Sequence, residues 1–122
     1  MFNIEQYRTY CLSKKQVTEH FPFDEDTLVF KVCNKMFALA SLKQWESGEG
    51  FINLKCNPEY AEELRATYDS ITPGWHMSKK LWNSVYFATG ELSVKFVLEL
   101  IDHSYEEVVR GLPKKVQATL RD

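Results

Sequence analysis

Two stretches of hydrophobic residues, 28–33 and 36–42, form the most clearly defined part of the pattern along the chain. Both are rich in the β-branched and aromatic residues that favour strands, and they flank Asn34-Lys35. Because Asn tolerates a positive φ angle, this dipeptide suits the two-residue loop of a type I′ turn. The pattern therefore predicts a β-hairpin over these residues.

The register that such a loop sets predicts how the hairpin divides its side chains between two faces. Val32 would face Phe37, and Phe30 would face Leu39. We expect these four large apolar side chains to be buried together against the long helix near the end of the chain. The opposite face would carry Val29, Lys31, Ala38 and Ala40.

Apolar residues at helical spacing predict three helices, over residues 3–12, 57–69 and 91–111. Asn3 and Asn57 are placed to cap the first two helices. The string SYEE at 104–107 has the pattern of a capping box, so we expect the third helix to break near Asp102 and to restart.

Further strands are expected around residues 51–56, 75–78 and 82–88, and an extended connector over 13–26. The predicted order of elements is α-β-β-β-α-β-β-α in a single domain that spans residues 1–122. Such an order favours an α+β fold of two layers, with an antiparallel sheet of about five strands backed by helices on one side.

Composition narrows the kinds of partner and the compartment. Fifteen Lys and Arg against seventeen Asp and Glu give a net charge of −2, so any nucleic-acid site must be a local patch. The first residues do not resemble a signal peptide, and no apolar run reaches the ~18 residues of a membrane span. The three cysteines lack CxxC spacing and fit free thiols, mostly buried. We expect a cytoplasmic protein that does not associate with membranes.

Six short strings, in this order along the chain, resemble those of MmcQ/YjbR-like proteins. They are VFKV (29–32), KMFAL (35–39), LKCNPE (54–59), PGWHMSKKLWNSV (73–85), LIDHSYEEVV (100–109) and LPKK (112–115). The resemblance covers residues 21–115 and implies a two-layer fold of the secretion-chaperone-like type. It also implies a DNA-binding role, carried by a pair of β wings. Leu81 stands where the family pattern commonly has a histidine, which removes one polar group from the surface that would contact DNA.

The segment 75–83, WHMSKKLWN, is the strongest candidate for a DNA site. It interleaves basic, aromatic and amide side chains, a mixture that contacts phosphate and stacks on bases, and no Asp or Glu occurs from residue 70 to residue 90. The alternative is a solvated Lys pair in a turn beside core tryptophans. The side chains expected to contact DNA are Lys35 near the hairpin turn, His76, Lys79, Lys80, Trp82 and Asn83.

A further basic cluster, formed by Arg110, Lys114 and Lys115, follows the last predicted helix. Positive charges at this position also stabilise the helix dipole, which is the simpler interpretation. Only nearness in space to Lys79 and Lys80 would join this cluster to the DNA site.

The residues indicate a binding protein rather than an enzyme. The three histidines lie in separate segments without metal-ligand spacing, and the best catalytic grouping, Cys33 or Cys56 with His76, rests on residue type alone. We expect no cofactor, no metal and a monomer.

The alternative function is a chaperone-like module that holds a protein or peptide partner on exposed aromatic side chains. Its anchors would be Trp45, Phe51, Trp75 and Trp82. Salt separates the two functions, because DNA binding weakens steeply as salt rises whereas an apolar peptide site is nearly indifferent to it.

Overall fold

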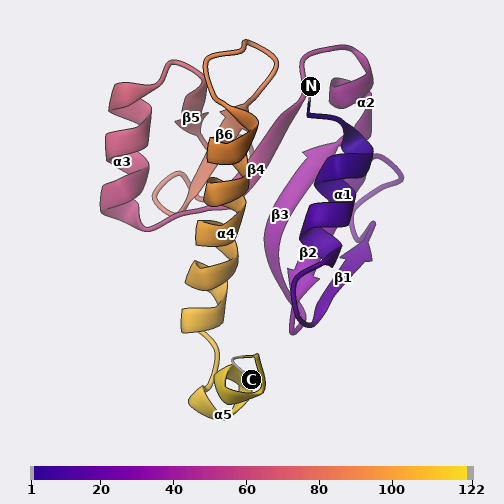
Figure 1. Cartoon of the computed structure of the whole chain (residues 1–122), viewed down its shortest axis with the longest axis vertical. Coiled ribbons are helices and arrows are strands. Elements are labelled where there is room, and N and C mark those ends of the chain that lie inside the picture. Colours follow the sequence, from indigo (N-terminus) through magenta and orange to yellow (C-terminus); the bar gives the residue numbers. More distant parts are fainter. Residues whose placement is uncertain (1, 121–122) are drawn as a thin grey trace.

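A six-stranded antiparallel sheet forms one layer of the structure, and helices form the other (Figure 1). The computed structural model describes residues 2–120. The elements in chain order are α1 (Ile4–Leu12), β1 (Val17–His20), β2 (Thr27–Val32), β3 (Lys35–Ser41), α2 (Leu42–Glu46), β4 (Phe51–Lys55), α3 (Pro58–Thr67), β5 (Ile71–Pro73), β6 (Trp82–Tyr86), α4 (Val94–Arg110) and α5 (Lys114–Leu120). The strand order across the sheet is β1-β2-β3-β4-β6-β5. The α+β class and the antiparallel sheet are confirmed, with one strand more than expected.

The predicted helix starts are confirmed in atomic detail. Asn3 and Gln6 form a reciprocal capping box at the start of α1. At α3, the Asn57 side chain accepts from the backbone amides of Glu59 and Tyr60, and Pro58 occupies the first turn. Both signals are local in sequence, which explains why the sequence alone reveals them.

Four elements differ from the sequence-based expectation. β1 forms within the expected connector, because it pairs with β2 and half-buries Val17 at the sheet edge. The strand expected at 75–78 is a loop, and β5 lies just before it. The short helices α2 and α5 were not expected. The Ser41 side chain caps α2. Leu120 of α5 packs in the main core.

The prediction that the last helix breaks near Asp102 is wrong, because α4 runs without interruption from Val94 to Arg110. The Ser104 side chain does not cap a helix. Its buried hydroxyl accepts from the Lys55 amide at 2.8 Å and donates to the Phe37 carbonyl. The hydroxyl therefore joins α4 to both β4 and β3.

The hairpin has the expected turn type but a different register. The turn residues are Cys33 and Asn34, both with positive φ (47° and 70°), so the turn lies one residue earlier than expected. Phe30 pairs with Ala38 and Lys31 with Met36, so Phe37 is an extra residue in a β-bulge. The bulge shifts the residues that follow it by one position, which changes the face on which they lie.

As a result, one of the four side chains expected to be buried together lies elsewhere. Phe30, Val32 and Phe37 belong to the main core with α4, as do Ala38 and Ala40, which were expected on the opposite face. Leu39 instead packs with Val29 and Trp82 in a separate cluster.

The two clusters mark the two faces of the sheet. Helices α1, α3 and α4 cover one face and bury the main core against it (Figure 1). The face turned away from these helices, called the outer face here, carries the cluster of Val29, Leu39 and Trp82. The loop 74–81 lies over this face, with Met77 packed on the cluster. No helix within residues 2–120 has the length and apolar character needed to cross a bilayer.

Candidate functional site

The loop 74–81 lies directly on β6, and Gly74 makes this possible. Its backbone amide donates to the Trp82 carbonyl at 2.9 Å. A Cβ atom at residue 74 would stand 2.8 Å from the Trp82 Cβ and 3.0 Å from the Trp82 carbonyl oxygen. Only glycine allows this close approach, so Gly74 determines where the loop begins.

A hydrogen-bond network then holds Trp75 over the outer face. The Trp75 amide donates to Ser84 Oγ at 2.9 Å, and Ser84 Oγ in turn donates to Asn53 Oδ1. Asn53 Nδ2 closes the network by donating to the Trp75 carbonyl at 3.1 Å. Ser84 and Asn53 are buried, so these bonds are shielded from water and fix the loop backbone. The Trp75 side chain is nevertheless 55% exposed.

The next residue, His76, has a positive φ of 59°. This conformation is uncommon for a residue with a side chain and is found where the surrounding structure enforces it. It turns the chain sharply after Trp75, so that Met77 returns to the sheet and packs against the Val29–Leu39–Trp82 cluster.

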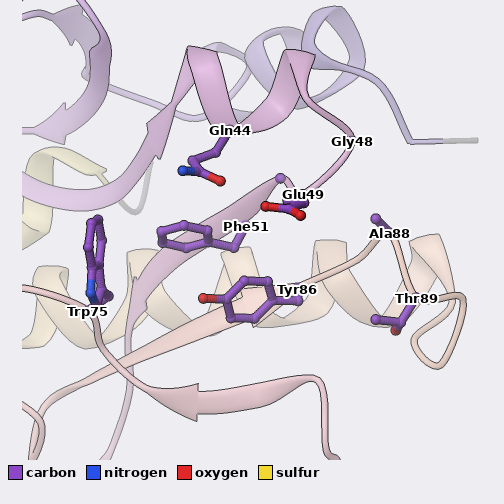
Figure 2. Close-up of a pocket in the computed structure, with 9 residues that line it drawn as sticks. Gln44, Gly48, Glu49, Phe51, Trp75, Tyr86, Ala88 and Thr89 are labelled. Carbon is purple, nitrogen blue, oxygen red and sulfur yellow. The ribbon is translucent and has the colours of Figure 1, made fainter.

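Two adjoining hollows flank Trp75 and share Phe51. One, of about 300 Å³, lies between the connector before β2 and the loop 74–81, and Phe23, Leu39 and Met77 line it. The other, of about 500 Å³, is lined by Phe51, Trp75 and Tyr86 with Gln44 and Glu49 (Figure 2). We call the two hollows together the aromatic groove. Its ring pairs are close, with centroids of Phe51 and Tyr86 4.9 Å apart and those of Phe51 and Trp75 6.1 Å apart.

The aromatic groove is apolar with a slightly acidic character. Phe23 is 63% exposed and Trp75 55%, which makes them the most exposed large apolar side chains among residues 2–120. The lining includes one carboxylate, Glu49, and one imidazole, His76, and neither Lys nor Arg. Exposed aromatic surface concentrated around a hollow is typical of a binding site.

The Lys pair expected to contact DNA lies outside this groove. Lys79 and Lys80 are both exposed, and they line a hollow that also contains Glu59, Glu62 and Arg65 of α3. No carboxylate neighbours the lysines along the sequence, but in space α3 brings two carboxylates and one guanidinium to them.

The other residues of the expected DNA site are distributed over different surroundings. Lys35 is exposed at the start of β3, two places from β6 in the sheet order, and His76 is exposed in the loop beside Trp75. Trp82 and Asn83 are buried, with exposures of 8% and 2%. Both side chains are therefore shielded from a surface ligand. Of the later basic cluster, Arg110 pairs with Glu107 at 2.6 Å.

Burial or hydrogen bonds define the surroundings of Cys11, Cys56, His20 and His103. Burial raises the pKa of the Cys56 thiol to about 12 and holds the pKa of Cys11 well above its usual range, so both thiols stay protonated near neutral pH. His103 accepts a hydrogen bond from the Asn57 amide at 3.2 Å, and His20 contacts Thr18. Among residues 2–120, no group of three or more His, Cys, Asp or Glu side chains could hold a metal ion.

Sequence reasoning found part of the aromatic groove and missed the rest. Of the four aromatic anchors expected for a protein partner, Phe51 and Trp75 line the groove, whereas Trp45 packs among Tyr7, Phe2 and Phe87 in the core. Tyr86 and Phe23 were not expected. The alternation of residues 51–56 was the available signal, because it already placed Phe51 and Asn53 together on the face opposite Ile52.

Comparison with known proteins places these observations in a wider group. The sequence pattern of the YjbR family matches residues 12–107. The uncharacterized protein YbdF of Escherichia coli O157:H7 is 41% identical over 101 residues, which make up 83% of this chain and 80% of that protein. The uncharacterized protein YjbR of Escherichia coli strain K12 is 30% identical over 117 residues, 96% of each chain.

Two crystal structures share the fold. Protein DR2400 of Deinococcus radiodurans, which has a DUF419 domain, matches with a TM-score of 0.87 and 35% identity, over 98% of this chain and 88% of that one. A protein from Pseudomonas syringae matches with a TM-score of 0.69 and 28% identity, over 84% of this chain and 96% of that one.

Proposed function

The chain belongs to the YjbR family, and from that premise we propose that it is a non-enzymatic binding module that holds a segment of another polypeptide in the aromatic groove of the outer face. The observation that carries this proposal is the exposure of Phe23 and Trp75 at the aromatic groove. Buried hydrogen bonds fix the backbone of the loop at Trp75. A large exposed aromatic side chain on a rigid loop costs little conformational entropy on binding, which suits it as an anchor.

The charge of the groove favours a polypeptide over a nucleic acid. Nucleic-acid affinity depends mainly on Lys and Arg side chains that neutralise phosphate. The groove lining has none, and Glu49 would repel phosphate. An extended peptide with apolar side chains could fill the hollows without bringing negative charge to them.

DNA binding is the second candidate function, and the exposure of Lys79 and Lys80 favours it. The neighbouring carboxylates of Glu59 and Glu62 lower the positive potential that phosphate would meet, and Arg65 beside them restores part of it. Any such site would lie beside α3 and away from the aromatic groove, so variants can separate the two functions.

Selection of short random peptides displayed on phage, followed by titration of the selected synthetic peptide, tests the proposal. We expect the selected peptide to bind saturably. Its affinity should change by less than about threefold between about 50 and about 300 mM salt, because few charges are neutralised on binding. Trp75→Ala should abolish this binding and leave the fold intact. Failure to select any peptide, or equal binding by Trp75→Ala, would overturn the proposal.

A poly-dT oligonucleotide and a DNA duplex, titrated under the same conditions, test the second candidate. Binding that weakens steeply with salt, together with a log–log slope flattened by about two in the variant Lys79→Ala/Lys80→Ala, would assign the function to DNA instead.

A further inference from the structure

The larger hollow of the aromatic groove combines three rings with a carboxylate, which is an unusual set of neighbours for an apolar anchor site. Phe51 comes from β4, Tyr86 from β6 and Trp75 from the loop 74–81. The Phe51 and Trp75 rings are nearly perpendicular, at 83°. In this edge-to-face contact, the edge of one ring meets the face of the other. Trp75 remains 55% exposed, and a cation is attracted to the open face of such a ring.

Glu49 supplies a full negative charge beside these rings. It stands in a tight turn after α2, where its backbone amide donates to the Gln44 carbonyl at 3.0 Å. The flanking residues fix this turn: Gly48 has a φ of 85°, and a Cβ at Gly50 would lie 2.8 Å from the Phe87 ring. The backbone position of Glu49 is therefore constrained, while its side chain is exposed.

The second polar side chain of the hollow is Gln44 of α2. Figure 2 shows the Gln44 side chain directed toward Phe51, with the Glu49 carboxylate drawn on the same side of that ring. No Lys or Arg lines the hollow to neutralise Glu49. The hollow thus offers π faces, one carboxylate and one amide, and all three attract a positive group.

We infer that the hollow formed by Phe51, Trp75, Tyr86 and Glu49 binds the guanidinium group of an arginine side chain in the bound polypeptide. The planar guanidinium stacks on an aromatic face and is more weakly hydrated than the ammonium of lysine, so less free energy is lost when it leaves water. Its forked N–H groups can donate to a carboxylate and to an amide oxygen, and Glu49 and Gln44 both line the hollow. This inference rests on the proposed function, because it names one side chain of the polypeptide that the groove holds.

Titration with N-acetyl-arginine methylamide tests the inference without knowledge of the natural partner. The readout is the NMR signal of the Trp75 indole N–H, assigned with the variant Trp75→Phe. We expect a saturable shift with the arginine probe and none with the citrulline analogue, which has the same shape and no charge. Equal shifts with the two probes, or no saturable shift with arginine, would overturn the inference.

A matched pair of variants identifies the carboxylate. Glu49→Gln should weaken binding of the arginine probe by about fivefold at low salt, the upper range for an exposed ion pair. Glu46→Gln removes the same charge three residues earlier, on a side chain that lines a different hollow with Arg8 and Glu19, and should leave binding unchanged. Equal effects of the two variants would contradict a specific role for Glu49.

These outcomes are distinct from those of the peptide selection. A selected peptide that binds equally well with arginine or with citrulline overturns the guanidinium site and leaves the peptide-binding function standing. A saturable arginine shift sensitive to Glu49→Gln, with no peptide ever selected, supports the guanidinium site and overturns the function proposed for the groove as a whole.

Discussion

At the scale of single residues, Phe37 shows how much of the fold depends on one side chain. It is fully buried at the bulge of β3, with its ring 5.5 Å from that of Tyr105 in an edge-to-face contact. Phe37→Ala should lower the free energy of unfolding by about 3 to 5 kcal/mol, because it leaves a cavity between the sheet and α4. Chemical denaturation measures the change, and a loss below about 1 kcal/mol would show that the ring does not pack as described.

His103 links stability to pH. It is partly buried, and loss of solvation lowers its pKa below the usual value of 6.5, opposed by Glu107 and assisted by Arg110. The neutral ring accepts the hydrogen bond from the Asn57 amide. A histidine with a lowered pKa contributes stability above its ordinary pKa and loses this contribution as pH falls through the lowered value, since the unfolded chain binds the proton more readily.

We therefore expect the wild type to lose more stability than His103→Gln between about pH 7.5 and about pH 5. Glutamine places a neutral acceptor near the same position, so the hydrogen bond is kept while the titration is removed. The measurement is denaturant unfolding of both proteins across this pH range. Parallel curves for the two proteins would show that His103 does not titrate differently in the folded state.

At the scale of elements, the contact between the loop 74–81 and β6 determines the shape of the groove. Gly74→Ala places a methyl group against the Trp82 backbone, so the loop must rise from the strand. We expect a loss of about 1 to 3 kcal/mol of stability, as for other overpacked sites, together with weaker binding of the selected peptide.

Gly111→Ala is the control for this prediction. Its new Cβ would meet only the Val108 carbonyl, at 3.5 Å, which is an ordinary contact. Thermal melting and peptide titration of both variants provide the measurements. An unchanged peptide affinity in Gly74→Ala would mean that the close contact between the loop 74–81 and β6 does not determine the shape of the groove.

The elements also show which features the sequence predicts and why others escape it. Caps and turn type depend on neighbours in sequence, so the Asn3 and Asn57 caps and the type of the hairpin turn were predicted correctly, whereas the turn lies one residue earlier than predicted. The bulge at Phe37 depends on a distant partner, because the Phe37 carbonyl bonds to Ser104 of α4. The pattern of neighbouring residues carries no information about this contact. The face on which Leu39 lies was therefore predicted wrongly.

The same distinction applies to the candidate site. Residue types predicted Phe51 and Trp75 as aromatic anchors, and the structure places both in the lining of the groove. The burial of Trp82 follows from the return of the loop to the sheet, which no local pattern indicates. The position of Glu59 beside Lys79 likewise depends on where α3 packs.

At the scale of the whole molecule, the two faces of the sheet differ in how they are covered. Helices α1, α3 and α4 bury one face and provide most of the core, so the fold does not need the outer face to be fully covered. The loop 74–81 covers part of that face and leaves the aromatic groove beside Trp75. The net charge of −2 argues against a surface that is suited to phosphate binding throughout.

Two phenylalanines close together in sequence test the central claim, that the groove on the outer face is the binding site, most directly. Phe23 is 63% exposed and lines the groove, whereas Phe21 is 48% exposed and lines a different hollow beside Arg8 and Trp45. The measurement is the dissociation constant of the selected peptide for Phe23→Ala and Phe21→Ala. We predict about a tenfold or greater weakening for Phe23→Ala, as for the loss of an interface anchor, and no change for Phe21→Ala. Equal affinities for the two variants, or a loss confined to Phe21→Ala, would contradict the claim.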